Sequence, residues 1–349
     1  MTKKLLTVLF CFLACAGIFT SSADYWLVTL NQRGRSQLRF RIHSLFSSSD
    51  ISIAPQTCPQ TAGGVDVVMT GSADRFDGLL TTVFSATQNK CPSSAYRFHI
   101  FTEDLTNEQK QTLKKLESPS VSIDFRAYAS KKAPCAARLL KNKAPTFLFA
   151  DSAPDLNQVL YLGDDTLVMR DLTAFNQIDL SVLKDFYIAA VRRHEPEKPA
   201  SRGFPWREKD QPPFEYPYFN ADVMSLNLDA LRAENIDAKA CAFSEKHGIP
   251  LEEQEEIWNG ISFGKAIFLP YADNAMTDAF SFENWENANM MTTLHNQYYS
   301  DMTPLPDFPE KVYETAVVIH YTSNEGKLAK PLNALRESYA EKARELIAP

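Results

Sequence analysis

Two carboxylates and one imidazole lie at the ends of apolar segments that are far apart in the sequence. Asp164 and Asp165 follow the apolar run "VLYL" and a glycine, and His320 ends the apolar run "AVVI". Carboxylate oxygens with one imidazole suit Mn²⁺ or Mg²⁺ better than a metal that prefers thiolates, and such an ion commonly faces a phosphate. Each motif also has an ordinary interpretation, because paired aspartates often form turns and a histidine in an apolar strand often belongs to the core.

The segments around these residues alternate between strand-like and helix-like patterns. Such alternation predicts a mainly parallel sheet, in which ligands bind beyond the carboxyl ends of the strands. We therefore expect Gly71 and the turn at 163–165 to lie at one edge of the sheet. The expected strands cover 65–71, 96–105, 121–128, 158–162, 265–274 and 315–320. A further strand, followed directly by a helix, is expected within 218–236. The other expected helices cover 77–89, 106–118, 133–150, 250–261 and 332–347.

Two of these helices carry local signals in their sequences. Thr106 is the expected N-cap of the helix at 106–118, with Glu108 or Gln109 in its first turn. Pro145 must break or kink the segment at 133–150, because proline lacks the backbone N–H that a helix interior requires.

The composition is that of an ordinary globular protein. The chain has 349 residues, of which 44% are hydrophobic and 23% are charged, enough for one large domain or two small ones. The formal net charge is −7 and no long basic run occurs. We therefore expect no nucleic-acid partner, because phosphates require clustered Lys and Arg.

Residues 1–23 have the pattern of a secretory signal peptide, with the basic start "MTKK", an apolar stretch and small residues that end at Ala23. The apolar stretch, residues 5–19, is shorter than the roughly 20 residues that span a membrane. A cleaved signal is expected, and the alternative is a short type II membrane anchor; only an uncleaved segment would contact a membrane. Outside this segment, Cys58, Cys91, Cys135 and Cys241 form disulfides or stay as buried thiols.

Several segments, in their order along the chain, resemble the retaining glycosyltransferases of family 8. They are "VLYLGDDTLV", "YFNADVMSLNL", "EEQEEIWN", "IFLPYADN" and "VVIHYTS" followed by "KPL". The resemblance runs from about residue 65 to residue 332 and implies an α/β protein of the GT-A fold, with a Rossmann-like, mainly parallel central sheet flanked by helices in a single large domain. That domain is expected at 63–335, after a leader segment at 24–62 and before a C-terminal helix at 336–349.

The resemblance also implies a site and its ligands. Members of this family use a nucleotide-sugar donor, usually a UDP-hexose, and a Mn²⁺ ion (or Mg²⁺) held by an Asp-x-Asp motif and a distant histidine. The implied metal ligands are Asp164, Asp165 and His320. The implied donor-binding residues are Thr70, Gly71, Arg138, Asp164 and either Lys327 or Lys330, and the residues implied at the transferred sugar are Asn220, Glu253 and Gln254, with Gln254 nearest the reacting carbon.

Four departures from the family pattern raise the question of activity. Gly163 stands where the family has its first Asp, so either Asp164 turns inward to compensate or the ion binds weakly; an Asp introduced at 163 is then expected to strengthen metal binding. The other departures are Asp222 in place of the Gly in Asn-Ala-Gly, Glu253-Gln254-Glu255 in place of Asp-Gln-Asp, and Ser323 in place of a Gly, with the lysine that follows it displaced to 327 or 330.

These features together predict a retaining glycosyltransferase that moves a hexose from a UDP-sugar to an unknown glycan, lipid or protein acceptor. The alternative, which the four departures motivate, is a catalytically impaired GT-A-fold protein that binds or regulates; a third is a nucleotide-sugar hydrolase. The signal predicts the secretory pathway, either the Golgi or endoplasmic reticulum lumen or secretion. The proline-rich stretch at 192–218 is a candidate for acceptor contact through Phe204, Trp206, Phe214 and Tyr216, or else a disordered excursion.

Overall fold

A seven-stranded sheet forms the centre of the protein in the computed structural model, which describes residues 53–60, 63–129, 134–193, 218–277, 310–322 and 329–347. Its strand order is β3-β2-β1-β4-β7-β6-β8. Only β7 runs antiparallel to its neighbours, β4 and β6, so the expected mainly parallel sheet is confirmed. The strands are β1 (Gly64–Gly71), β2 (Ala95–Thr102), β3 (Val121–Arg126), β4 (Gln158–Leu162), β6 (Ile188–Arg192), β7 (Phe219–Asn227) and β8 (Ala266–Leu269).

A second, three-stranded sheet was not expected from the sequence. It consists of β5 (Thr166–Val168), β10 (Val318–His320) and β9 (Ala275–Met276), with β10 in the middle. β10 pairs antiparallel with β5, so that His320 lies opposite Thr166. This pairing brings the end of the last strand next to the acidic turn that separates β4 from β5.

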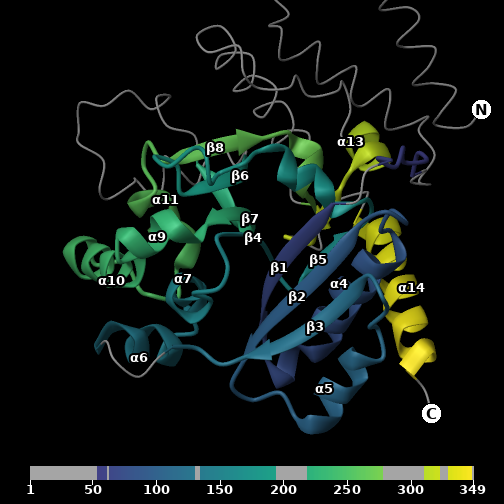
Figure 1. Cartoon of the computed structure of the whole chain (residues 1–349), viewed down its shortest axis with the longest axis horizontal. Coiled ribbons are helices and arrows are strands. Elements are labelled where there is room, and N and C mark those ends of the chain that lie inside the picture. The colour runs from purple at the N-terminus through teal and green to yellow at the C-terminus, as the bar shows by residue number, and fades with distance from the viewer. Residues whose placement is uncertain are drawn as a thin grey trace, which may run out of the picture. The chain divides into compact units, whose positions relative to one another are not determined.

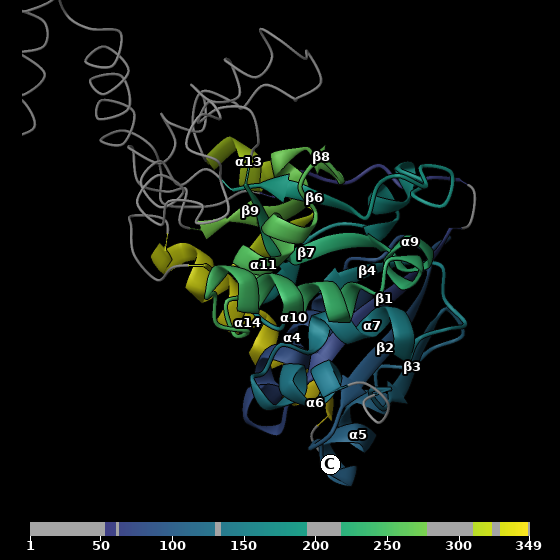
Figure 2. The same cartoon turned by 90° about the vertical axis from the view of Figure 1, so that its left-hand side faces the viewer.

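Helices cover both faces of the central sheet (Figures 1 and 2). Alternate residues of β1 point to opposite faces, with Val67 and Met69 in one apolar core and Val68 in the other. One face carries α4 (Phe76–Gln88), α5 (Asn107–Lys114) and α14 (Ala329–Ile347); the other carries α6 (Pro134–Lys141), α7 (Phe149–Ser152), α9 (Leu228–Ala233), α10 (Ile236–His247) and α11 (Gln254–Ile261). The remaining elements are α13 (Glu310–Thr315) and the 3₁₀ turns η1 (Ala73–Arg75), η2 (Pro145–Leu148), η3 (Leu172–Gln177) and η4 (Tyr271–Asn274).

Both local signals act as expected. The Thr106 hydroxyl accepts a hydrogen bond from the backbone N–H of Gln109, whose side chain accepts one from the N–H of Thr106, which completes a capping box at the start of α5. Pro145 begins the 3₁₀ turn η2, which separates α6 from α7. Several elements had no counterpart in the expected set, among them β5, β6, β9, α10 and α13, and α14 begins at Ala329 rather than at 336.

All four cysteines outside the N-terminal segment are paired in disulfides. Cys58–Cys91 ties the segment at 53–60 to the residues before β2, and Cys135–Cys241 joins α6 to α10. The possibility of four buried thiols is therefore wrong. No helix within the described ranges is long and apolar enough to cross a membrane. The expected signal, residues 194–217 of the proline-rich stretch with its four aromatic residues, and Lys327 lie outside the described residues.

Candidate functional site

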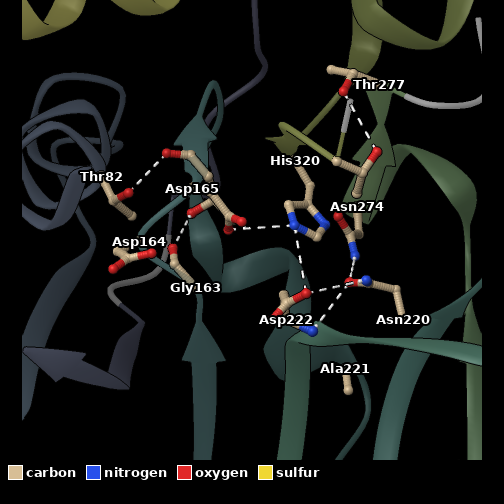
Figure 3. Close-up of polar contacts among 12 residues, drawn as sticks. Thr82, Gly163, Asp164, Asp165, Asn220, Ala221, Asp222, Asn274, Thr277 and His320 are labelled. Atoms are coloured by element: carbon tan, nitrogen blue, oxygen red, sulfur yellow. Dashed lines mark hydrogen bonds and ion pairs between the residues drawn. The ribbon is translucent and has the colours of Figure 1, made fainter. Parts of the chain in front are cut away.

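The imidazole of His320 lies between two carboxylates at the carboxyl edge of the central sheet (Figure 3). Its Nε2 is 3.3 Å from Oδ1 of Asp165 and 3.6 Å from Oδ2 of Asp222. The His320 side chain is almost fully buried, whereas 30% of the Asp165 side chain and 45% of the Asp222 side chain remain accessible. The cluster is thus anchored in the core on the histidine side and open to solvent on the carboxylate side.

Backbone hydrogen bonds fix this geometry. The N–H of Gly163 donates to the carbonyl of Asp222 at 2.8 Å, which extends the β4–β7 ladder by one residue. The N–H of Tyr321 donates to the carbonyl of Asp165 at 3.0 Å, and the Thr166 hydroxyl donates to the carbonyl of Gly163 at 2.8 Å. The acidic turn is therefore held from both sides, by β7 and by β10.

Asp165 and His320 favour an ion pair. Burial raises the pKa of a carboxylate, but the neighbouring His320 outweighs it and holds the pKa of Asp165 below its ordinary value. Burial lowers the pKa of an imidazole, yet Asp165 and then Asp222 raise the pKa of His320 above its ordinary value. The imidazole of His320 and the Arg75 guanidinium, whose Nη2 lies 3.9 Å from Oδ2 of Asp165, are groups that can balance the charge of these carboxylates.

Asp164 does not join this cluster. Its carboxylate points away from His320 (Figure 3) and pairs with Arg75, at 2.6 Å between Oδ1 and Nη2. Burial raises the pKa of Asp164 to about 6, and Asp165 and Asp222 add to this shift while Arg75 opposes it. A Cβ on Gly78 would lie 2.4 Å from the Asp164 carbonyl oxygen, so the close approach of α4 to this turn requires glycine. The idea that Asp164 turns inward to replace the missing ligand is wrong for this structure.

Asn220 connects the cluster to α11. Its side-chain amide donates to Oε2 of Glu255 at 2.9 Å, and its amide oxygen accepts a hydrogen bond from Asn274 at 2.9 Å. Glu255 also accepts a hydrogen bond from Arg193, at 2.8 Å. Burial raises the pKa of Glu255 above its ordinary value despite the Arg193 guanidinium beside it. These contacts lead from Asn220 to Glu255, and the expected role of Asn220 at the transferred sugar stays a prediction.

The structure directs Gln254 away from the cluster, contrary to its expected place nearest the reacting carbon. Its side chain accepts a hydrogen bond from the Thr146 hydroxyl at 2.6 Å and donates to the Lys143 carbonyl at 3.0 Å. Glu253, also expected at the sugar, is an exposed residue that precedes the first turn of α11. Successive residues of a helix point about 100° apart, so only Glu255 among these three faces β7.

The other residues that the family resemblance implies for binding the nucleotide-sugar donor lie in different parts of the structure. Thr70 and Gly71 end β1, which is parallel to β4, so the expectation that Gly71 and the acidic turn share an edge is confirmed. Arg138 is an exposed residue of α6 that pairs with Glu245 of α10. Lys330 lies in the first turn of α14. Donor binding by these residues stays a prediction.

Sequence reasoning assigned no site role to Glu255, Arg75 or Asp222. Arg75, which contacts Asp164, sits in an ordinary polar turn and carries no local signal. Asp222 did carry one, because it departs from the family pattern on the strand that pairs with β4, but the sequence alone did not connect this gain of a carboxylate with the loss at Gly163.

The donor types in the cluster fit a hard divalent cation. Two carboxylates and one imidazole suit Mn²⁺ or Mg²⁺, and the described contacts leave the buried Nδ1 of His320 without a hydrogen-bond partner. Within the described ranges, no three His, Cys, Asp or Glu side chains already have the arrangement of a metal site.

The sequence profile of a family described as "Glycosyl transferase family 8" matches residues 66–328. Among solved structures, the galactosyltransferase LgtC in complex with donor and acceptor sugar analogues has a TM-score of 0.56 at 18% identity, covering 82% of this chain and 97% of that one. The apo form of the glycosyltransferase GlyE from Streptococcus pneumoniae TIGR4 has a TM-score of 0.53 at 18% identity, covering 82% of this chain and 62% of that one. At such identities these likenesses show the fold alone. No curated protein sequence is similar enough to count as a match.

Proposed function

Because the chain belongs to glycosyl transferase family 8, we propose that it is a retaining glycosyltransferase that moves a hexose from a UDP-sugar to an acceptor in a reaction that depends on Mn²⁺. The observation that carries the proposal is the buried His320 beside the Asp165 carboxylate at the carboxyl edge of the sheet. In open α/β sheets this edge is where ligands bind. The acceptor we expect is a glycan, a lipid or a protein.

Asp165 and His320 are the residues of the family motif that would hold the ion. A bound dication would stabilise the negative charge that develops on the diphosphate as the sugar leaves. The β4–β5 turn positions Asp165, and β10 positions His320. The imidazole is buried, so the surrounding fold fixes its orientation. Arg75 is half-exposed beside Asp164 and is placed to meet an anionic ligand.

Asn220 and Glu255 are the best-placed side chains for the transferred sugar. Both are held by hydrogen bonds to protein partners, and hydroxyl-rich ligands are oriented by such fixed donors and acceptors. We therefore assign to Glu255 a positioning role at the transferred sugar, in place of Gln254, which the sequence placed nearest the reacting carbon. The position of Gln254 beside Thr146 gives it a structural part in seating α11.

We propose that the protein works in the secretory pathway or outside the cell. The two disulfides support this, because such bonds form and persist mainly in oxidising compartments. The protein would then encounter its UDP-sugar donor in the lumen of the Golgi or endoplasmic reticulum, or in the compartment to which it is delivered.

Thermal unfolding of the purified protein with UDP, with and without Mn²⁺, tests the proposal. A ligand that binds only the folded state stabilises it by an amount that rises with ligand concentration above the dissociation constant. We expect UDP with Mn²⁺ to raise Tm, and UDP alone to raise it much less. GDP with Mn²⁺ is the matched control for the base. If millimolar UDP with Mn²⁺ leaves Tm unchanged, the proposed function is wrong.

A second readout separates transfer from binding. Incubation with radiolabelled UDP-sugars is expected to release UDP and labelled product in the presence of Mn²⁺. Binding of UDP with Mn²⁺ but no release from any UDP-hexose, with or without glycan acceptors, would instead support the alternative of an impaired, ligand-binding member of the family.

A further inference from the structure

Gly163 and Asp222 are direct partners across two neighbouring strands. β4 and β7 are antiparallel, with Leu162 opposite Val223, and the hydrogen bond from Gly163 to Asp222 places these two residues as the next pair. Residues directly opposite in an antiparallel ladder project to the same face of the sheet. A carboxylate on either residue therefore reaches the same space, from one strand or from the other.

That space does not hold two side chains comfortably. A Cβ built on Gly163 would lie 3.3 Å from the Cβ of Asp222 and 2.8 Å from Oδ1 of Asp165. The first distance is tighter than ordinary contacts between such atoms, and the second requires the Asp165 carboxylate to move. The resemblance to family 8 implies Asp at 163 together with Gly at 222, whereas this chain has Gly at 163 together with Asp at 222. Each combination leaves one carboxylate and one glycine in the pair.

The Asp222 carboxylate already lies where a ligand should lie. Its Oδ2 is 3.6 Å from Nε2 of His320, the same nitrogen that Asp165 approaches at 3.3 Å. Only 2% of the His320 side chain is accessible, and the buried Nδ1 has no hydrogen-bond partner within the described residues. The ring is therefore oriented by what lies at Nε2, between the two carboxylates (Figure 3).

We infer that Asp222 supplies the carboxylate that Gly163 lacks, so that Asp165, Asp222 and His320 form the site for a divalent cation. The ligand has moved from β4 to its cross-strand partner on β7, and the departures at 163 and 222 form one compensated exchange. This inference rests on the proposed function for the identity of the cation. It also reverses one expectation from the sequence, because an Asp at 163 meets the Cβ of Asp222 while that residue is present, and so does not by itself strengthen binding.

Four proteins test the exchange: the wild type, Asp222→Gly, Gly163→Asp and the double variant. The measurement is the affinity for Mn²⁺ alone, from the electron paramagnetic resonance signal of free Mn²⁺, repeated in the presence of UDP. We expect Asp222→Gly to weaken Mn²⁺ binding by about 10-fold to 100-fold or more. Mutation of residues that only support a metal ligand already lowers metal affinity by this range. Gly163→Asp alone should give no gain, and the double variant should bind within about 10-fold of the wild type.

Non-additivity is the decisive feature, because residues in contact couple and independent ones add. If Asp222 only oriented His320, a carboxylate added at 163 would not rescue the loss. Asp222→Asn, which keeps the size of the side chain, should also weaken binding, and far-ultraviolet circular dichroism checks that each variant is folded. Equal Mn²⁺ affinity in the wild type, Asp222→Gly and Asp222→Asn would overturn the inference, as would losses that simply add in the double variant.

The outcomes also separate the inference from the proposed function. Mn²⁺ binding that depends on Asp222, in a protein that does not bind UDP, would support the inference and refute the UDP-sugar donor. Binding of UDP with Mn²⁺ that is indifferent to Asp222 would do the reverse. A wild type that binds no Mn²⁺ in either condition would overturn both.

Discussion

The sheet carries two clusters of a histidine with carboxylates, and they differ in how their charges are balanced. In the first, Asp66 on β1 accepts a hydrogen bond from Arg97 Nε at 2.6 Å and contacts His99 Nε2 at 2.9 Å. Burial raises the pKa of Asp66, but Arg97 and His99 outweigh it and lower the pKa to about 2. This carboxylate is satisfied by the Arg97 guanidinium and by its contact with His99.

The second cluster places two carboxylates against one imidazole nitrogen. The groups near it that can carry positive charge are the imidazole of His320, the half-exposed Arg75, Arg193 and Arg336. The carboxylates that they face are those of Asp164, Asp165, Asp222 and Glu255. The contrast teaches that a buried histidine beside an aspartate is not in itself a sign of function. What distinguishes the edge cluster is that the carboxylates of Asp165 and Asp222, which come from two different strands or turns, both approach the Nε2 of His320.

The largest expected effect is the loss of cation binding at the second cluster. Asp165→Asn should weaken Mn²⁺ binding by more than about 100-fold, because it removes a charged ligand and not only a supporting partner. Asp66→Asn is the matched control in the first cluster and should leave Mn²⁺ affinity unchanged. Titration of Mn²⁺ against both variants checks this. A similar loss in both would erase the distinction between the clusters.

The next effect concerns the two neighbours at the start of α11. Glu255→Gln should lower turnover of the UDP-sugar by about 10-fold to 100-fold, because a misplaced positioning group commonly costs this much. Gln254→Ala should instead lower the free energy of unfolding by about 1 kcal/mol, through the lost hydrogen bond with Thr146. Release of UDP and urea unfolding measure the two. A larger loss of turnover in Gln254→Ala would restore the assignment made from sequence.

The smallest effect is on stability in acid. The folded-state pKa of Asp66, about 2, lies below the unfolded value, so its contribution is present above about pH 4 and is lost as the pH falls towards 2. Asp66→Asn should therefore lower the free energy of unfolding by about 1–2 kcal/mol at pH 7, allowing for the exposure of Arg97, and by almost nothing near pH 2.

Urea unfolding at several pH values measures this difference. Asp124→Asn, which changes an exposed carboxylate on β3, is the control and should stay within about 0.5 kcal/mol of the wild type at pH 7. A difference between wild type and Asp66→Asn that grew towards low pH would contradict the assignment of Asp66 as a satisfied ion pair.

Most of the central sheet could be predicted from the sequence, because its strands are continuous apolar runs and its helices carry local signals such as Thr106 and Pro145. α10 was missed because its buried face contains small or polar residues such as Ala240 and Ser244 and gives little apolar periodicity. β6 is short and reveals itself only through its pairing with β7 and β8.

The candidate site divides in the same way. Asp165 and His320 could be found because each ends an apolar run and matches a motif of a known family. The roles of Asp222 and Glu255 could not, since they depend on which residue lies opposite Gly163 and on which side of α11 faces β7. Cross-strand partners and helix rotation are properties of the packed structure, and a one-residue shift changes the face that a side chain occupies.

The central position of β10 in the small sheet has a consequence for the order in which the protein is made. β4 and β7 can pair, and bring Asp165 and Asp222 together, as soon as both strands have been synthesised. The imidazole comes with β10, after a further stretch of chain that takes several seconds at roughly 5–20 residues per second. During that interval the two carboxylates have no histidine between them. At the proposed cation site, tight binding would therefore be a property that a nascent chain acquires only once β10 is in place.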